Sequence, residues 1–214
     1  MSDAAARLHA IRSAIAEAAR VARREPTDVT LVAVSKKRSV DEIEALIEAG
    51  QRHFGENRVQ EAASKWPALR ARYPDVTLHM IGQLQSNKAE EAADLFDVIH
   101  SLDRSSLAQA LAKAGWTKPT YLQVNIGEEE QKGGVAIADL PAFLETVRSQ
   151  KIDVAGLMAI PPAGVEPAPF FALLAKLARR HDVTGLSMGM SGDLASAVML
   201  GATIVRVGTA LFED

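Results

Sequence analysis

Lys36 is the residue of this chain best placed for covalent chemistry. It ends the run VAVSK, and the nearly all-apolar segment 29–35 before it has the composition of a buried strand. If that strand ends at a dry opening, the surroundings favour the uncharged amine, which is the form that attacks an aldehyde. From position alone, Lys36 also fits a solvated lysine after a strand, which is the commoner arrangement. We interpret Lys37 and Arg38 as helix-approach or surface charges.

A second group of residues, near the C-terminus, could bind an anion. The segments 186–193 (LSMGMSGD) and 205–210 (VRVGTA) place small residues with free backbone N–H groups at two neighbouring helix starts. Turns of this kind bind phosphate groups because several N–H donors point at one spot. The phosphate ligands that we expect are Ser191, Gly192, Gly208 and Thr209. The alternative is that Ser191 is an ordinary N-cap and Gly208 a tight-turn glycine.

The elements that must position these residues alternate regularly along the chain. An amphipathic helix is predicted within residues 1–25 and is stopped by Pro26. Short apolar runs, often β-branched, then predict eight strands, at residues 29–35, 53–55, 77–81, 98–102, 120–125, 154–159, 185–188 and 203–207. Segments with helical periodicity lie between them, at residues 40–49, 58–71, 87–95, 105–114, 139–149, 168–180 and 192–200. Helix C-caps are expected at Gly50, Gly115 and Gly201.

This alternation predicts an α/β fold with parallel strands and right-handed crossovers. Eight repeats without a doubled element favour one domain over residues 1–214, a single (β/α)8 TIM barrel with the N-terminal helix packed on it. The alternative is a doubly wound open sheet, but SKKRS rather than a Gly-rich turn follows the first strand. In a barrel, Lys36 and the two anion-binding turns would share one opening. An amine and a phosphate cup together suit an aldehyde cofactor with a phosphate arm.

At this point the sequence resembles a known family, the pyridoxal 5′-phosphate (PLP) homeostasis proteins, which are PLP-binding barrels like the N-terminal domain of alanine racemase. The resemblance covers nearly every predicted strand end, in order. The motifs that carry it are VAVSK (32–36), FGENRVQEA (54–62), HMIGQLQSNK (79–88), IHSLDR (99–104), VNIGEEEQKGG (124–134), GLMAIPP (156–162) and LSMGMSGDLASAVMLGATIVRVGTALF (186–212).

The resemblance implies a role for each matching residue. Lys36 would hold PLP as a Schiff base, Asn57 would contact the side of the cofactor ring, and Arg206 would face the pyridine nitrogen. Lys132 matches a loop lysine near the barrel mouth that would handle incoming or outgoing PLP, although a solvated loop charge fits it as well. The phosphate group would be held by Ser191, Gly208 and Thr209.

An arginine beside the pyridine nitrogen disfavours turnover. A guanidinium cannot accept the ring proton that most PLP carbanion chemistry uses, so it weakens the ring as an electron sink. The two tyrosines, Tyr73 and Tyr121, fall at a helix end and at a strand start, where neither could serve as a second acid or base. We therefore expect a protein that binds and delivers PLP and is not an enzyme. The alternatives are a PLP-dependent amino-acid racemase or decarboxylase with weak activity, and a Schiff-base aldolase.

Other polar residues near strand ends allow competing interpretations. His53, His79 and His100 lie on three consecutive predicted strands, but no His-x-His pair or bridging carboxylate accompanies them, so we interpret them as hydrogen-bonded barrel histidines and expect no metal. Glu56 and Asp103 could be general bases, or could cap the helices that follow them.

Composition sets the cellular context that we expect. The formal net charge of −3 argues against nucleic-acid and anionic-membrane surfaces, and no apolar run is long enough to span a bilayer. The absence of cysteine excludes disulfides and thiolate chemistry and fits a reducing compartment. We expect a cytoplasmic monomer whose partners are PLP and, transiently, apo forms of PLP-dependent enzymes.

Overall fold

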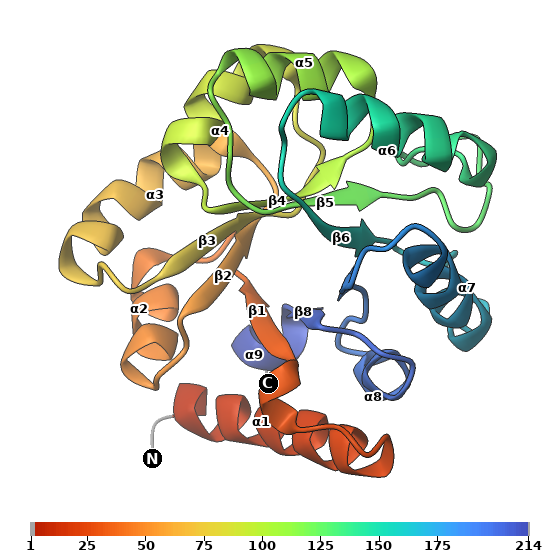
Figure 1. The fold of residues 1–214 in the computed structure, drawn as a ribbon. Coiled ribbons are helices and arrows are strands. Elements are labelled where there is room, and N and C mark those ends of the chain that lie inside the picture. Colours follow the sequence, from red (N-terminus) through yellow and green to blue (C-terminus); the bar gives the residue numbers. More distant parts are fainter. Residues whose placement is uncertain (1–2, 214) are drawn as a thin grey trace.

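The computed structural model describes residues 3–213 and shows a closed barrel of eight parallel strands, surrounded by helices (Figure 1). The strands follow chain order around the barrel, and β8 closes it by pairing with β1. This closure confirms the predicted TIM barrel and makes the doubly wound alternative wrong. Because all neighbouring strands are parallel, their carboxyl ends meet at one rim.

The elements of the barrel lie within two residues of their predicted bounds. The strands are β1 (Thr30–Val34), β2 (His53–Glu56), β3 (Thr77–Met80), β4 (Val98–Leu102), β5 (Thr120–Gln123), β6 (Val154–Met158), β7 (Gly185–Ser187) and β8 (Ile204–Val207). The α-helices are α1 (Asp3–Val21), α2 (Val40–Glu48), α3 (Val59–Arg72), α4 (Ala89–Leu95), α5 (Ser105–Lys113), α6 (Leu140–Ser149), α7 (Ala168–Arg180), α8 (Leu194–Met199) and α9 (Thr209–Phe212). Short 3-10 turns are η1 (Pro26–Asp28), η2 (Ser86–Lys88) and η3 (Ile137–Asp139).

The N-terminal helix α1 ends earlier than the sequence predicts. Its last residue is Val21, and the chain then turns through Arg23, whose φ is 55°. The N–H of Arg24 donates to the carbonyl of Ala19. This bond completes a C-cap in which Arg23 has the left-handed backbone conformation. Pro26 therefore does not stop α1 but begins the 3-10 turn η1. In Figure 1, α1 lies outside the barrel beside α8 and α9, which it contacts.

Helix α8 begins two residues later than predicted. Two hydrogen bonds between Met190 and Asp193 close the turn before α8. The N–H of Asp193 donates to the carbonyl of Met190, and the side chain of Asp193 accepts from the N–H of Met190. Asp193 is the N-cap residue, and α8 starts at Leu194. The interpretation of Ser191 as an ordinary N-cap is therefore wrong.

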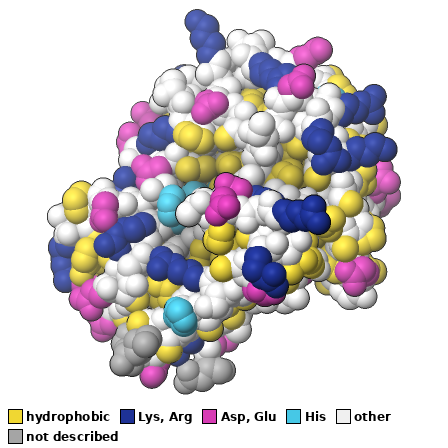
Figure 2. Space-filling view, turned by 60° about the horizontal axis from the view of Figure 1, so that its bottom comes forward, with side chains coloured by type: hydrophobic (Ala, Val, Ile, Leu, Met, Phe, Trp, Pro, Cys, Tyr) yellow, Lys and Arg dark blue, Asp and Glu magenta, His cyan; other side chains and the backbone are white. Residues whose placement is uncertain are grey.

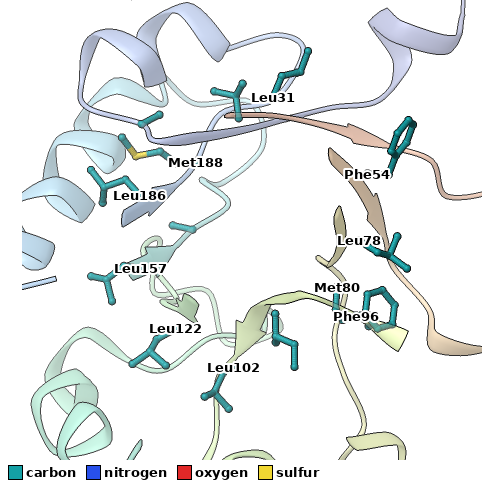
Figure 3. Close-up of a cluster of buried hydrophobic side chains, with 14 of the residues drawn as sticks. Leu31, Phe54, Leu78, Met80, Phe96, Leu102, Leu122, Leu157, Leu186 and Met188 are labelled. Atoms are coloured by element: carbon teal, nitrogen blue, oxygen red, sulfur yellow. The ribbon is translucent and has the colours of Figure 1, made fainter. Parts of the chain in front are cut away.

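Two different layers of side chains occupy the two faces of the barrel sheet. Most residues that point away from the barrel axis are apolar and form the main core, among them Phe54, Leu122 and Leu157, which are labelled in Figure 3. Inside the barrel, a smaller apolar cluster includes Val32 and Met158. Polar side chains accompany that inner cluster, so the interior is not purely hydrophobic. The buried polar residues on β3, β4, β7 and β8 include His79, His100, Ser187 and Arg206.

Local side-chain and backbone features define both ends of α2. Ser39 caps its start, with the Glu42 side chain returning to the Ser39 backbone in a capping box. Gly50 follows its last turn with a φ of 97°, a left-handed conformation that glycine adopts without strain. Gly115 and Gly201 likewise have positive φ, which agrees with their expected positions after helices.

No helix within residues 3–213 combines the length and the apolar character needed to cross a membrane. On the face drawn in Figure 2, acidic and basic side chains are interspersed among apolar ones.

Gly156 is the glycine at which we expect the barrel to tolerate a side chain least. A Cβ at this position would lie 2.1 Å from the carbonyl oxygen of Gly185 on the neighbouring strand, so backbone would have to move. We expect Gly156→Ala to lower the free energy of unfolding by about 3 kcal/mol, measured by urea unfolding followed by tryptophan fluorescence. Gly192→Ala is the matched control, because a Cβ there meets nothing within 4 Å. Equal stability of the two variants would contradict the close packing of β6 and β7.

Candidate functional site

A pocket of about 870 Å³ opens at the carboxyl ends of β1, β2 and β8. It receives side chains from the turns that follow these strands and from the turn before α8. Six of the seven residues that the sequence suggested for cofactor binding line it, namely Lys36, Asn57, Ser191, Arg206, Gly208 and Thr209. Gly192, the additional phosphate ligand expected from the sequence, lines it too. The barrel thus brings together residues that lie at opposite ends of the chain.

Lys36 occupies a tight turn at the end of β1. The N–H of Arg38 donates to the carbonyl of Ser35, and Lys37 between them has a φ of 59°. Lys36 itself is exposed on the wall of the open pocket. The dry surroundings expected for Lys36 are therefore wrong, because charged side chains and small turn residues leave this side of the barrel mouth open to solvent.

A buried ionic cluster supports the turn that carries Lys36. Glu56 points out of the barrel, where its carboxylate accepts hydrogen bonds from Ser35 Oγ at 2.8 Å and from Trp66 Nε1 at 3.0 Å. The amine of Lys65 lies 2.8 Å from the same carboxylate and 3.1 Å from the carbonyl of Ser35. Ser35, the residue before Lys36, is thus held twice. Its hydroxyl binds Glu56, and its carbonyl binds Lys65. Glu56 therefore acts as a buried structural group, and it does not cap α3, whose N-cap residue is Arg58.

Asn57 follows β2 and lies half-buried at the pocket wall. Its backbone passes directly over Gly82, where a Cβ would come within 2.3 Å of the Asn57 carbonyl oxygen. Only glycine at position 82 allows this approach, so the loop after β3 helps to define where Asn57 lies. The sequence motif that contains Gly82 thus positions a pocket residue without lining this pocket.

The turns around Ser191 and Gly208 offer several donors to the pocket. The hydrogen bonds formed in the turns and loops of residues 3–213 do not use the N–H groups of Ser191, Gly192 or Gly208 as donors. Thr209 adds a hydroxyl on the same side of the pocket. Gly189 makes the first turn possible, because its φ is 97° and a Cβ would lie 2.5 Å from Cβ of Ala197. The arrangement suits an oxyanion such as a phosphate group.

Arg206 forms the floor of the pocket and is 5% exposed. Its guanidinium donates to Ser187 Oγ and, at 3.2 Å, to the carbonyl of Ala159. Both partners are neutral, and within the described chain no carboxylate forms an ion pair with this guanidinium. Burial lowers the pKa of Arg206 to about 10, while the charge of Asp193 acts in the opposite direction. Arg206 therefore remains a cation at neutral pH and can donate to a ligand above it.

The three strand histidines are hydrogen-bonded to one another inside the barrel. This agrees with their interpretation as hydrogen-bonded barrel residues. Burial lowers the pKa of His79 to about 3 and holds the pKa of His100 well below its usual range, with smaller contributions from neighbouring positive charge. Burial also lowers the pKa of the less deeply placed His53. At neutral pH the interior histidines are therefore uncharged.

Lys132 lies on the same rim but not in this pocket. Its amine is 2.6 Å from a carboxylate oxygen of Glu129 and 3.4 Å from the carbonyl of Pro161, so it links the loops after β5 and β6. Asp103, the other candidate base, pairs with Arg104 at 2.7 Å. The N-cap residue of α5 is Arg104, so a capping role for Asp103 is wrong.

Arg38 is a pocket residue that the sequence interpretation missed. It was expected to be a helix-approach or surface charge. It does precede Ser39, the N-cap residue of α2, but it also lines the pocket and pairs with Glu213. Its place two residues after Lys36 is the signal that could have found it, because every residue of that turn lies at the active rim of a barrel. Together with Lys37 and Arg58, it gives the pocket wall a positive character.

Comparison with known proteins shows which family the chain is related to. Residues 7–214 match the family model described as alanine racemase, N-terminal domain. A pyridoxal phosphate homeostasis protein of Pseudomonas aeruginosa is 41% identical, with 99% of this chain and 96% of the relative covered. The chain belongs to the pyridoxal phosphate homeostasis protein family. The resemblance that the sequence motifs indicated is thus confirmed.

Solved structures of similar proteins agree with this family and with the barrel. An unknown protein from Bifidobacterium adolescentis has a TM-score of 0.92 at 33% identity, with 99% of this chain and 97% of that chain covered. PipY of Synechococcus elongatus, solved with PLP bound, has a TM-score of 0.79 at 42% identity, with 92% of this chain and 99% of that chain covered.

The buried cluster behind Lys36 should contribute strongly to stability. Glu56→Ala leaves the buried amine of Lys65 with one fewer carboxylate and removes the acceptor of Trp66 and Ser35. We expect the free energy of unfolding to fall by about 3 kcal/mol, measured by urea unfolding. Glu17→Ala is the control. Glu17 forms an exposed ion pair with Arg20 on α1, so this substitution should leave the free energy of unfolding unchanged within error. A Glu56→Ala variant as stable as the control would contradict the role of the cluster.

Proposed function

We propose that this protein holds PLP as a Schiff base on Lys36 and takes part in intracellular PLP homeostasis by storing the cofactor and delivering it. The observation that carries the proposal is that Lys36, Arg206 and the turns around Ser191 and Gly208 line a single pocket. PLP supplies an aldehyde that condenses with amines and a ring that can act as an electron sink. The membership of the chain in its family and the PLP found in PipY support the same cofactor.

The residues present fit PLP at both of its ends. Ser191, Gly192 and Gly208 have N–H groups that can donate to phosphate oxygens, and the Thr209 hydroxyl adds a further donor. At the floor of the pocket, Arg206 has neutral partners and donors to spare, which suits an unprotonated pyridine nitrogen. Lys36 lies on the wall between these two features, and Asn57 would contact the side of the ring.

The positions of the tyrosines and carboxylates among the described residues support binding without turnover. Tyr121 is buried inside the barrel and stacks on His100, and Tyr73 lies at the end of α3, bonded to Glu44. Neither lines the pocket. The carboxylates that do, Glu61 and Glu213, are engaged with Lys65 and Arg38 respectively. Since Arg206 also keeps the ring a weak electron sink, the site suits holding the cofactor rather than racemisation or decarboxylation.

The exposure of Lys36 is consistent with reversible capture. A lysine on an open pocket wall is accessible both to PLP and to the water or amine that would release it. We further propose that Lys132, at the neighbouring part of the rim, guides PLP as it arrives or leaves. The recipients would be apo forms of PLP-dependent enzymes in the cytoplasm, met transiently by a monomeric carrier. Sustained racemisation or decarboxylation of amino acids by the PLP-loaded protein would overturn the carrier function.

The first test is covalent capture at Lys36. We expect PLP-treated protein to be yellow and borohydride to fix a phosphopyridoxyl group on the peptide that contains Lys36, detected by mass spectrometry. Lys36→Ala should lose both the colour and the label. Lys37→Gln is the matched control, because it removes the adjacent amine only, and it should keep both. Labelling of Lys36→Ala at the wild-type level would show that another lysine is the attachment site.

The second test concerns the phosphate-binding turns. Each hydrogen bond to a charged group contributes about 1.5–3 kcal/mol, so removing the hydroxyls of Ser191 and Thr209, with the backbone N–H groups left in place, should weaken PLP binding at least about tenfold. We expect Ser191→Ala combined with Thr209→Val to have this effect in an absorbance titration. Binding of pyridoxal, which lacks the phosphate, should change little in the same variant. An equal loss of affinity for both compounds would mean that these residues do not contact the phosphate group.

A further inference from the structure

The interior of the barrel carries a continuous line of hydrogen bonds that ends at Arg206. His53 Nδ1 lies 3.1 Å from His79 Nε2, and His79 Nδ1 lies 2.9 Å from His100 Nε2. The line then crosses the barrel, because His100 Nδ1 lies 2.7 Å from Ser187 Oγ. Arg206 donates to that same oxygen at 2.5 Å. Five side chains from five strands are thus joined in series, from the half-buried His53 to the floor of the pocket.

The chemistry of the end groups gives this line a direction. A guanidinium only donates, so Ser187 Oγ must accept from Arg206. The hydroxyl has one hydrogen of its own, and His100 Nδ1 is the acceptor within reach. A neutral His100 then carries its hydrogen on Nε2 and donates to His79 Nδ1. His79 in turn donates from Nε2 to His53, which leaves the free Nε2–H at the least buried ring.

The opposite direction leaves a buried donor without a partner. If His100 carried its hydrogen on Nδ1, Ser187 Oγ would accept from both His100 and Arg206. The hydroxyl hydrogen of Ser187 would then have no acceptor among the hydrogen bonds of the described chain, although the residue is fully buried. An unsatisfied buried donor is unfavourable. The observed distances therefore favour one tautomer for each histidine.

A charged histidine is also disfavoured in this line. His100 shares Ser187 with the buried guanidinium of Arg206, so a second positive charge there would be repelled. The lowered pKa values of His79 and His100 agree with this. Tyr121 stacks on the His100 ring, with the ring centres 4.8 Å apart, and this contact restrains the ring in its plane. Three neutral histidines therefore sit beneath a single cation.

We infer that His100, acting through Ser187, is a positioning residue for Arg206, and that the histidine line keeps Ser187 an acceptor for the guanidinium. When His100 Nδ1 carries no hydrogen, it accepts the hydroxyl hydrogen of Ser187, so that hydrogen points away from Arg206 and a lone pair of the oxygen faces the guanidinium. With the lone pair facing Arg206, Nη1 of the guanidinium is held on Ser187 and Nη2 on the carbonyl of Ala159, so the guanidinium plane is fixed. The consequence for PLP rests on the proposed function, in which Arg206 faces the ring nitrogen.

The direction of the line can be measured on the full-length protein without any ligand. Long-range ¹⁵N–¹H spectra of protein labelled on histidine distinguish the two neutral tautomers and the charged form. We expect His53, His79 and His100 all to be neutral with hydrogen on Nε2 at neutral pH. Finding His79 or His100 charged, or with hydrogen on Nδ1, would overturn the inference.

The effect on Arg206 can be measured with His100→Phe. The phenyl ring keeps the stacking on Tyr121 but removes the acceptor of Ser187, so the Nε–H signal of Arg206 should shift in the unliganded protein. PLP should bind about tenfold more weakly, while borohydride still labels Lys36 at saturating PLP. His100→Asn restores an oxygen near the position of Nδ1 and should recover most of both effects. Tyr121→Phe is the matched control, because it leaves the line intact and should shift neither readout.

The outcomes separate this inference from the proposed function. An Arg206 signal that moves in His100→Phe supports the positioning role, even if the wild-type protein captured no PLP and the proposed function failed. If PLP is captured on Lys36 but the Arg206 Nε–H signal is the same in wild type and in His100→Phe, the proposed function is supported and the positioning role of His100 is contradicted. If His100→Phe does not fold, Ser187→Ala serves instead. The His100 Nδ1 signal must then shift toward that of a nitrogen without a donor, and an unchanged signal contradicts the inference.

Discussion

β8 pairs with β1 along four residue pairs, from Thr30 with Ile204 to Ala33 with Val207, and this seam closes the barrel. Because the strands are parallel, the seam brings Lys36, in the turn after β1, into the same pocket as Arg206, near the end of β8, and Gly208, which follows β8. The pocket depends on this closure more than on any single side chain. An open sheet with the same strands would leave Lys36 and Arg206 at opposite edges.

The closed barrel also explains how a buried cation is tolerated. Arg206 enters the barrel interior from β8, where an isolated charge is unfavourable without hydrogen-bond partners. The polar inner residues of β4 and β7 provide them through His100 and Ser187, and the carbonyl of Ala159 after β6 completes the set. The apolar layer that stabilises the barrel lies on the other face of the strands, beneath the helices (Figure 3). The main apolar core and the polar partners of Arg206 therefore lie on opposite faces of the sheet.

An open wall and a rigid floor together suit reversible binding. Lys36 is exposed, although the backbone before it is tied to the buried pair of Glu56 and Lys65. The Lys36 amine is therefore accessible, while the backbone that carries it is held in place. Arg206, in contrast, is buried and restrained on two sides. A cofactor held between such groups can exchange with solvent without losing its orientation while bound.

The sequence alone predicted the barrel and the order of its elements, because period-two and helical patterns and glycines after helices are local signals. Strand-end positions and small residues at helix starts indicated Lys36, Ser191, Gly192, Gly208 and Thr209, whereas the roles of Asn57 and Arg206 came from the resemblance to a known family. The sequence placed the end of α1 and the start of α8 incorrectly, since Arg23 and Asp193 close turns that periodicity does not show. Only the tertiary structure decided that Lys36 is exposed, that Glu56 is a buried ion-pair partner and that His100 meets Ser187. His100 and Ser187 are 87 positions apart in the chain, and such a contact arises only when the barrel closes.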